Sequence, residues 1–539
     1  MLISTTGERK VAGGARPWLA RRLFFPSLTD LFFSLVLTIA FLTGGDGWQA
    51  LLQDGDTGYH IRTGAYILAS RQIPAHDLFS FSRPGAPWYA WEWLSDVIFA
   101  GLHSLAGLKG VVLFTAILLT AVFTLVLRDA LKRGANSLLA LALMFTAINA
   151  SYVHLFARPH IFTFLFVAGA MILIRDDRTR HGARIWLLAP FTAIWANLHG
   201  GFVLLFPLLG LLAIGSAAEA WLDRAGRARR ISDSLRYVGV ALACGLASLL
   251  NPYGIQLHLH IFQSLGARWL IDLVSEFNSP TFHSGPSAFM LLLFLALAAV
   301  TPLLRKGKVT EPLWLLFLAY CALVSVRHIP IFALVATPIV AVEATAWWND
   351  WIGRLSRRST PRILDDIAGQ MRTGFAGVTL WTPAFLAAIA FAGGMQWPTD
   401  ISADHCPAAL IRRHADPIAA ARILTVDQWA DYLIYHYYPR QRVFFDGRSD
   451  FYGEQMALDY LKMTEGRASW KETLDKYRFD MVLCPVNWPL ASLLRYQPDW
   501  RATDDDGKAV LFEKIRLNAA IPAVPAAIPS AASRTWPRP

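Results

Sequence analysis

The stretch Gln53-Asp54-Gly55-Asp56-Thr57-Gly58-Tyr59-His60 lies just past the first long apolar run of the chain, Asp30–Leu42. Such a run ends at a membrane surface, so Asp54 and Asp56 would be delivered there. Asp56 or Thr57 is expected to cap the following helix, because a short polar side chain accepts the free N–H groups of a first helical turn. Asp56 and His60 are four residues apart and would share a helix face. The stretch therefore predicts a loop that carries chemistry and to which the rest of the chain brings further polar groups.

The composition is that of an α-helical polytopic membrane protein. Of the 539 residues, 55% are hydrophobic and 17% are charged. The apolar residues come in runs near the ~20 that cross a bilayer as a helix. We expect about eleven transmembrane helices within a membrane domain over 30–396: Asp30–Leu42, Val111–Leu127, Leu138–Val153, Ile161–Ile174, Ile185–Leu198, Phe202–Trp221, Tyr237–Leu250, Ala288–Leu304, Leu313–Val326, Ile331–Trp347 and Ala376–Phe391. Trp93–Leu105 is too short to span and is expected as an interfacial helix, and Thr57–Ser70 as an amphipathic one.

The loops between these runs fall into two sets that alternate along the chain. One set is basic and begins with the N-terminal segment 1–29, and the positive-inside rule places it in the cytoplasm. This distribution also explains the net charge of +11 without a nucleic-acid partner. The other set holds the polar motifs: the first outer loop 44–110 with Asp54 and Asp56, the Arg158-Pro159-His160 turn, the turn with His199, the loop with Glu276, and the Arg327-His328 turn. We therefore expect all of these motifs together on the outer face.

From residue 397 the sequence alternates between short strand-like and helical segments. Strands are expected at 423–426, 443–445, 481–484 and 510–513, and helices at 428–438, 455–465, 470–477 and 490–496. This alternation predicts a small α/β domain over 397–517, which an odd number of spans places outside the cytoplasm. The tail 518–539 is rich in Ala, Pro and Ser and is expected to be disordered. Whether Cys406 and Cys484 form a disulfide stays open.

Candidate site residues come from the outer turns. Asp54 and Asp56 could act as a general base or hold a divalent metal, which is the one cofactor considered, and a helix cap with a turn is the alternative. A membrane-boundary arginine is a candidate for binding an anion, with snorkelling to lipid phosphates as the alternative. The candidates for contacts to a substrate are His60, Arg158, His160, His199, Glu276, Arg327 and His328. Glu92 and Asp96 are expected to solvate one face of the interfacial helix.

Phe445–Tyr452 is the densest polar and aromatic stretch of the C-terminal domain. It could hold a sugar by stacking and hydrogen bonding. An internal bridge between Asp446 and Arg448 that fixes a strand and its turn is an equally good interpretation.

The order of these features resembles the GT-C superfamily of integral-membrane glycosyltransferases. Shared features are a basic N-terminus, one span, an acidic outer loop with interfacial helices, many further spans and an outer C-terminal domain. The chain is similar to bacterial members with the patterns Asp-Thr-Gly-aromatic-His-Ile-Arg-Thr-Gly, here Asp56–Gly64, and Asp-Gly-Arg-Ser/Asn-Asp-Phe-Tyr-Gly, here Asp446–Gly453. In the mannosyl- and aminoarabinose-transferases the loop's acidic residues are adjacent, whereas Gly55 separates them here.

The resemblance implies a polyprenyl-phosphate sugar donor and transfer on the outer side of a bacterial inner membrane, to a hydroxyl of a glycan, lipid or protein acceptor. The hydroxyl needs a base, for which Asp56 and then Asp54 are the candidates. The leaving phosphate needs cations, for which the basic residues of the outer turns are available. Two other functions stay open. A transporter or flippase of lipid-linked sugars would carry polar residues deep in its spans, which these runs almost lack. A non-catalytic protein could bind polysaccharide through its C-terminal domain.

Overall fold

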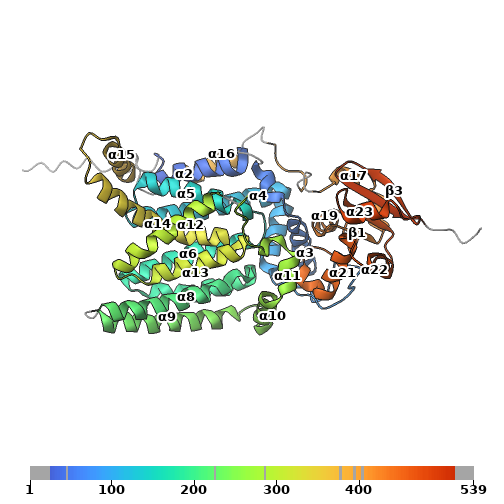
Figure 1. The fold of residues 1–539 in the computed structure, drawn as a ribbon, viewed down its shortest axis with the longest axis horizontal. Coiled ribbons are helices and arrows are strands. Elements are labelled where there is room, and N and C mark those ends of the chain that lie inside the picture. Colours follow the sequence, from blue (N-terminus) through green and yellow to red (C-terminus); the bar gives the residue numbers. More distant parts are fainter. Residues whose placement is uncertain are drawn as a thin grey trace, which may run out of the picture.

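The computed structural model describes residues 25–43, 47–223, 226–283, 287–374, 379–391, 396–401 and 406–515. Most of the predicted cytoplasmic segment 1–29 and the whole predicted tail 518–539 lie outside these ranges. The protein is mostly helical (71%) with a small sheet near the C-terminus. A long helical body occupies one end of the molecule and the sheet-containing domain the other (Figure 1).

The helical body consists of long helices joined by short turns. Its elements are α2 (Leu28–Val36), α4 (Trp93–Lys132), α5 (Ser137–Ser151), α6 (His160–Arg180), α7 (Leu188–Leu198), α8 (Leu205–Leu222), α9 (Arg227–Ser248), α12 (Ser287–Arg305), α13 (Thr310–Val324), α14 (Ile329–Ile352), α15 (Thr360–Gly374) and α16 (Trp381–Phe391). Every residue of α14 from Ile329 to Ala341 is buried, as expected of a helix enclosed by others. It contacts α4, α5, α6, α12 and α13 and is the core of the body.

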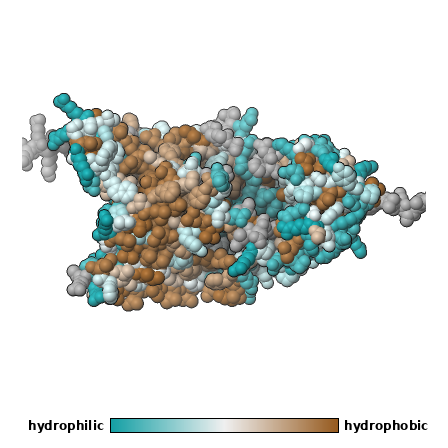
Figure 2. Space-filling view, viewed as in Figure 1, coloured by the Kyte–Doolittle hydropathy of each residue, from teal (hydrophilic) through white to brown (hydrophobic). Residues whose placement is uncertain are grey.

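The predicted number of spans is not confirmed. Among the described residues, five helical stretches are long and apolar enough to cross a membrane: Trp93–Lys132, Ser137–His154, Gly200–Leu222, Ser287–Arg305 and Val326–Ile352. Other predicted runs lie on helices that are shorter, such as α13 and α16, or that carry a charged end, such as α9. A broad hydrophobic band covers the helical body, and hydrophilic residues dominate the C-terminal domain (Figure 2). This is the surface of a protein whose body lies in lipid.

The predicted interfacial helix and the span after it form the two halves of α4. The helix breaks at Ala106 and Gly107, whose backbone angles are not helical. The first half stays next to α3 (Asp56–Ser70), the helix that begins at the acidic loop. The shorter helices α10 (Ile255–Gly266) and α11 (Arg268–Leu273) belong to the same end of the body (Figure 1).

The C-terminal domain is a small α/β domain, as the sequence predicts. Its strands are β1 (Ile423–Thr425), β2 (Met481–Pro485), β3 (Trp500–Asp505) and β4 (Ala509–Lys514), in the order β1-β2-β4-β3. Strands β1 and β2 are parallel, and β4 runs antiparallel to both of its neighbours. Its helices are α17 (Ala408–Arg413), α18 (Ala415–Ala420), α19 (Asp427–Tyr437), α20 (Ser449–Tyr452), α21 (Glu454–Thr464), α22 (Trp470–Tyr477) and α23 (Pro489–Leu494).

One strand prediction in this domain is wrong, and one strand of the sheet, β3, is not predicted. The segment 443–445 is not a strand of the sheet. Val443 instead exchanges backbone hydrogen bonds with Phe79 and Phe81 of the first outer loop, at 2.9 Å each. Strand β3 escapes prediction because all but its first residue is at least partly exposed and the strand is polar. Cys406 and Cys484 are both buried and both free thiols.

The C-terminal domain docks on the acidic loop through α19. The N–H of Gly55 donates to Gln428 Oε1 at 2.6 Å. A side chain at Gly58 would lie 2.8 Å from the Asp431 carbonyl oxygen, so only glycine permits this approach. The two domains therefore meet where the first loop leaves the membrane body.

Candidate active site

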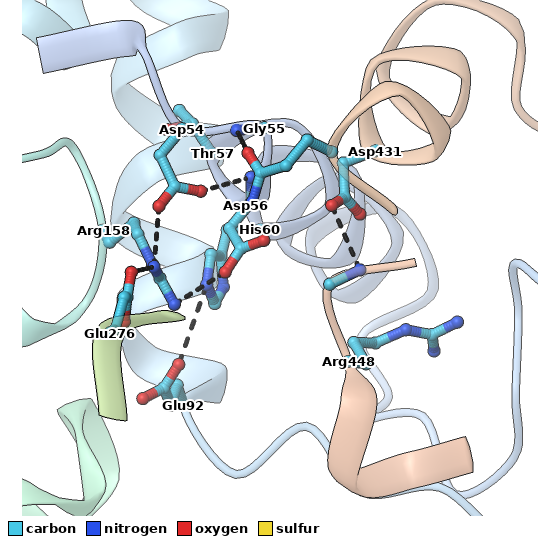
Figure 3. A network of polar contacts seen from close by, with 12 residues as sticks. Asp54, Gly55, Asp56, Thr57, His60, Glu92, Arg158, Glu276, Asp431 and Arg448 are labelled. Atoms are coloured by element: carbon cyan, nitrogen blue, oxygen red, sulfur yellow. Dashed lines mark hydrogen bonds and ion pairs between the residues drawn. The ribbon is translucent and has the colours of Figure 1, made fainter. Parts of the chain in front are cut away.

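Three carboxylates meet at one guanidinium where the two domains touch (Figure 3). Arg158 Nη1 donates to Asp54 Oδ2 and to Glu276 Oε1, both at 2.7 Å. Arg158 Nη2 lies 2.7 Å from Asp56 Oδ2. The four residues come from the acidic loop, the turn before α6 and the 3-10 turn Ser275–Phe277. The sequence thus correctly predicts that these separate polar turns gather at one end of the body.

The predicted cap of the helix is wrong. Helix α3 begins after Gly55, and neither Asp56 nor Thr57 caps it. Asp54 Oδ1 instead accepts the backbone N–H of Asp56 at 2.9 Å, which orients the loop. Thr57 donates its hydroxyl to the Ala157 carbonyl oxygen at 3.0 Å and so ties the loop to the Arg158 turn. Asp56 is therefore free for another role, and its Oδ1 is buried with no hydrogen-bond partner among the described residues.

Burial and charge give the carboxylates different proton affinities. Burial raises the pKa of Asp56 well above its usual value, and the charges of Asp54 and Glu276 add to this despite the opposing effect of Arg158. Burial would also raise the pKa of Glu276, but Arg158 and Arg327 outweigh it and hold that pKa below its usual value. A carboxylate with a raised pKa is the better proton acceptor. Asp56 is thus the strongest base candidate in this cluster.

A second acidic cluster lies behind α3, and it corrects the prediction for Glu92 and Asp96. Asp96 is only 2% exposed and shares a 2.6 Å hydrogen bond with His60 Nδ1, so it does not solvate a helix face. Glu92 lies between two histidines, 3.7 Å from His60 Nε2 and 3.5 Å from His199 Nε2. Burial raises the pKa of Glu92 to about 7 and lowers that of His60 to about 4. His60 therefore stays neutral near pH 7.

His199 and His160 belong to the same end of the body. The Gly201 N–H donates to His199 Nδ1 at 2.9 Å, so Nδ1 is the acceptor nitrogen and Nε2 carries the proton toward Glu92. Burial lowers the pKa of His199 to about 3, which also favours the neutral ring. His160 stacks on His154, with ring centroids 4.2 Å apart. His154 Nδ1 lies 3.9 Å from Glu276 Oε1, and the sequence gives no motif that singles out this histidine.

Arg327 and His328 lie on the adjacent turn before α14. The Arg327 guanidinium stacks over the Phe277 ring at 4.5 Å, next to Glu276. No carboxylate of the described residues lies within ion-pair distance of it, although Glu276, Glu92 and Asp56 act on it electrostatically. His328 Nδ1 is buried and has no partner among the described residues. Arg327 is therefore available to an anion.

Within the Asp446–Gly453 motif, Asp446 and Arg448 form an internal ion pair that is closed to a ligand. Arg448 bonds Asp446 with two nitrogens, at 2.8 and 2.7 Å, and also pairs with Asp77 of the first outer loop at 2.9 Å. Its guanidinium stacks over the Trp88 ring at 4.6 Å, and in Figure 3 it points away from the acidic cluster. The internal bridge is thus the correct interpretation of Asp446 and Arg448.

The same motif brings Gly447 against the catalytic candidate. A side chain at Gly447 would lie 2.1 Å from Asp56 Oδ1 and 2.9 Å from Asp431 Oδ2. The Gly447 N–H donates to Asp431 Oδ2 at 3.1 Å. Burial raises the pKa of Asp431 well above its usual value, and the charge of Asp56 adds to this. Asp431 is a site residue that the sequence does not reveal, because the docking of α19 is a tertiary feature.

The described residues do not form a site for a divalent metal. No group of three or more His, Cys, Asp or Glu side chains among the described residues has an arrangement that could hold one. Asp54 and Asp56 are the ligands that the sequence offers if a metal is bound, and Arg158 occupies the place between them and Glu276. The donor set fits a guanidinium at this position.

Comparison with solved structures supports the same fold. No protein-family profile and no curated protein matches the sequence. The oligosaccharyltransferase of Archaeoglobus fulgidus, tethered with an acceptor peptide, is 12% identical, with a TM-score of 0.53 over 88% of this chain and 69% of that chain. Archaeal AglB from the same organism, in complex with an inhibitory peptide and a dolichol-phosphate, is 10% identical, with a TM-score of 0.51 over 92% of this chain and 74% of that chain.

ArnT from Cupriavidus metallidurans, bound to undecaprenyl phosphate, is 14% identical, with a TM-score of 0.43 over 93% of this chain and 99% of that chain. At such identities a likeness concerns the fold and not the activity. On the agreement with the two archaeal oligosaccharyltransferase structures, the chain shares their fold.

Proposed function

We propose that the protein is a membrane glycosyltransferase that moves a sugar from a polyprenyl-phosphate donor to an acceptor hydroxyl, with Asp56 as general base. One observation carries this proposal. Asp56 is a buried carboxylate that Arg158 holds by one oxygen, while the other oxygen has no partner among the described residues. A fixed carboxylate with a free lone pair and a raised pKa suits a base that takes a proton in a transition state.

The acceptor oxygen attacks the anomeric carbon and forms the new C–O bond, and its proton passes to Asp56 Oδ1. The bond between the anomeric carbon and the phosphate oxygen breaks, and its electron pair leaves with polyprenyl phosphate. The charge that develops on this phosphate needs a nearby cation. Arg327 fits this role because it has no ion-pair partner among the described residues and lies beside the acidic cluster.

The position of Asp56 Oδ1 indicates the path by which the acceptor would reach the base. Asp56 Oδ1 faces Gly447 and Asp431 of the C-terminal domain. A hydroxyl that reaches it has to enter between the first loop and this domain and displace the Gly447 segment. Binding of the acceptor would therefore be coupled to a small movement of the C-terminal domain.

The position of the charges supports transfer on the outer face of a bacterial inner membrane. The acidic loop and the C-terminal domain share one end of the body, and α15, which follows the basic 354–358 segment, lies at the other (Figure 1). The positive-inside rule would then put the C-terminal domain outside. AglB binds a dolichol-phosphate and a peptide. A related fold thus accommodates a lipid phosphate together with a second ligand.

The test is a comparison of two Asp→Asn variants of the purified full-length protein in lipid nanodiscs. A panel of polyprenyl-phosphate sugars is offered with cell-envelope glycans, lipids and peptides, and transfer is measured by mass spectrometry. Asp56→Asn should reduce the rate by about 10²–10⁴-fold, the usual contribution of a general base. The control, Asp416→Asn, changes a carboxylate whose side chain is 89% exposed and should leave the rate unchanged. Wild-type turnover by Asp56→Asn would refute the assignment.

A further inference from the structure

A second pocket lies at the junction of the two domains, between the first outer loop, α10 and the Asp446–Gly453 segment. Its volume is about 240 Å³, far above the ~30 Å³ that one water molecule takes in the liquid. None of its lining residues is a lysine or an arginine. The side chains that matter for its chemistry are Tyr89, Trp91, Gln256, His260, Gln263 and Asp450.

Aromatic rings form one wall of this pocket. Trp91 stacks on His260, with ring centroids 4.4 Å apart and planes 16° from parallel. Tyr89 lies against Trp91 at 4.9 Å, and Tyr253 meets Trp91 edge-on at 4.9 Å. Because these rings hold one another, the wall needs little rearrangement to accept a ligand. The side chain of Tyr89 is 40% exposed, so its ring is open to one.

Polar groups face the same space. Gln256, His260 and Gln263 recur at the spacing of one helix face of α10, and all three line the pocket. His260 Nε2 lies 3.1 Å from Asp450 Oδ2, which orients the imidazole at the edge of the pocket. Amide, imidazole and carboxylate groups at an aromatic wall provide both donors and acceptors.

We propose that this pocket binds the acceptor and that the acceptor is a saccharide. The inference rests on the glycosyl transfer proposed above and names the acceptor class. A sugar ring presents an apolar C–H face to an aromatic wall and a rim of hydroxyls to carboxylate and amide groups. A lipid-linked phosphate is a less suitable ligand, because no lysine or arginine lines the pocket to pair with its negative charge. The sugar headgroup of the donor shares this chemistry, so the test has to separate the two.

Two residues that line the pocket, Trp91 and Asp450, belong to segments that also contribute to the candidate active site. Trp91 precedes Glu92, which lies between His60 and His199. Asp450 belongs to the Asp446–Gly453 segment, which also contains Gly447, the residue that faces Asp56 Oδ1. A saccharide in the pocket is thus held beside the segment that an entering hydroxyl has to displace. The geometry suits a long acceptor whose end reaches the base.

The first arm of the test measures binding of free saccharides. Full-length protein in nanodiscs is titrated with maltohexaose, cellohexaose, chitohexaose and mannohexaose, and tryptophan fluorescence reports binding. Tyr89→Ala should weaken the best ligand about tenfold and Gln263→Ala several-fold. Both residues are exposed, so the fold should be retained. The control, Tyr496→Ala, removes a tyrosine that is 88% exposed on the C-terminal domain and should bind as the wild type does.

The second arm uses an undecaprenyl-phosphate-linked hexose, whose binding should be unchanged in the pocket variants. Three results would overturn the proposal: no binding of any of the four saccharides at millimolar concentration, equal affinity in wild type and Tyr89→Ala, or a loss confined to the lipid-linked hexose. Asp56→Asn separates this proposal from the catalytic one. It should bind the saccharide normally and lose transfer. If it kept full transfer, the catalytic assignment would fail although the pocket binds.

Discussion

Removal of the Arg158 guanidinium should destabilise the protein strongly and in a pH-dependent way. Arg158 contacts three carboxylates at 2.7 Å each, and the side chains of Asp54 and Asp56 are only 7% and 5% exposed. In Arg158→Gln these acids would be left buried beside one another without a cation. Loss of one partner of a buried ion pair costs about 3–5 kcal/mol.

Protonation of the buried acids limits this loss of folding stability and makes the loss depend on pH. The folded-state pKa of Asp56 already lies above its usual value, and without Arg158 it would rise further, because burial and like charge both disfavour the anion. Such groups stabilise the folded state least at high pH, so the loss should be about 3–5 kcal/mol at pH 8 and smaller at pH 5. Unfolding in nanodiscs, followed by tryptophan fluorescence against denaturant, measures both values.

The matched control is Arg440→Gln. Arg440 pairs with Asp416, but the two side chains are 67% and 89% exposed, so the change should be within about 0.5 kcal/mol of wild type at either pH. If Arg158→Gln unfolded with the same midpoint as Arg440→Gln at pH 8, the three carboxylates would not depend on Arg158. The description of the acidic cluster would then be wrong.

Three further changes probe the surroundings of Asp56. Gly447→Ala places a methyl group 2.1 Å from Asp56 Oδ1. This change should lower the transfer rate about tenfold or more while leaving donor binding intact. An unchanged transfer rate would contradict the contact. Arg327→Gln should weaken the binding of polyprenyl phosphate about tenfold, which is the scale of one charged hydrogen bond. Equal dissociation constants of the variant and the wild type in a binding titration would exclude Arg327 from the phosphate site. Asp96→Leu leaves buried His60 without its 2.6 Å hydrogen-bond partner and should lower the free energy of unfolding by about 1–3 kcal/mol. Asp96→Asn keeps a partner for His60 and should lower the free energy of unfolding by less. Equal values for the two variants would argue against this hydrogen bond.

Much of the site could be predicted from the sequence. The charge of the loops and their alternation along the chain indicate which turns lie at the same end of the helical body. Asp54, Asp56, Arg158 and Glu276 are far apart in the chain, and the alternation of basic and motif-bearing loops is enough to bring them together. The same reasoning places Arg327 and His199 nearby. What it does not give is the contact between individual groups. The single guanidinium shared by three acids is visible only in the structure.

The residues that escaped prediction share a physical reason. Asp431 and Gly447 reach Asp56 through the docking of the C-terminal domain, which no local pattern encodes. Asp96 has a partner because α3 packs on the first half of α4, so an acidic residue on an interfacial helix became buried. The predicted number of spans is not confirmed, because an apolar run indicates the position of a helix better than its length. Shorter or end-charged helices such as α9 and α13 satisfy the pattern without meeting the length and composition of a full span.

The claim that Asp56 is the base, with its pKa raised partly by Asp54, is tested most directly by the pH dependence of single-turnover transfer in wild type and Asp54→Asn. A base works when it is deprotonated, so the wild-type rate should rise with pH through the pKa of Asp56. Loss of the Asp54 charge removes one cause of the raised pKa. The rising limb should therefore move to lower pH in Asp54→Asn. A limb that stays in place, or moves to higher pH, would contradict the assignment of Asp56.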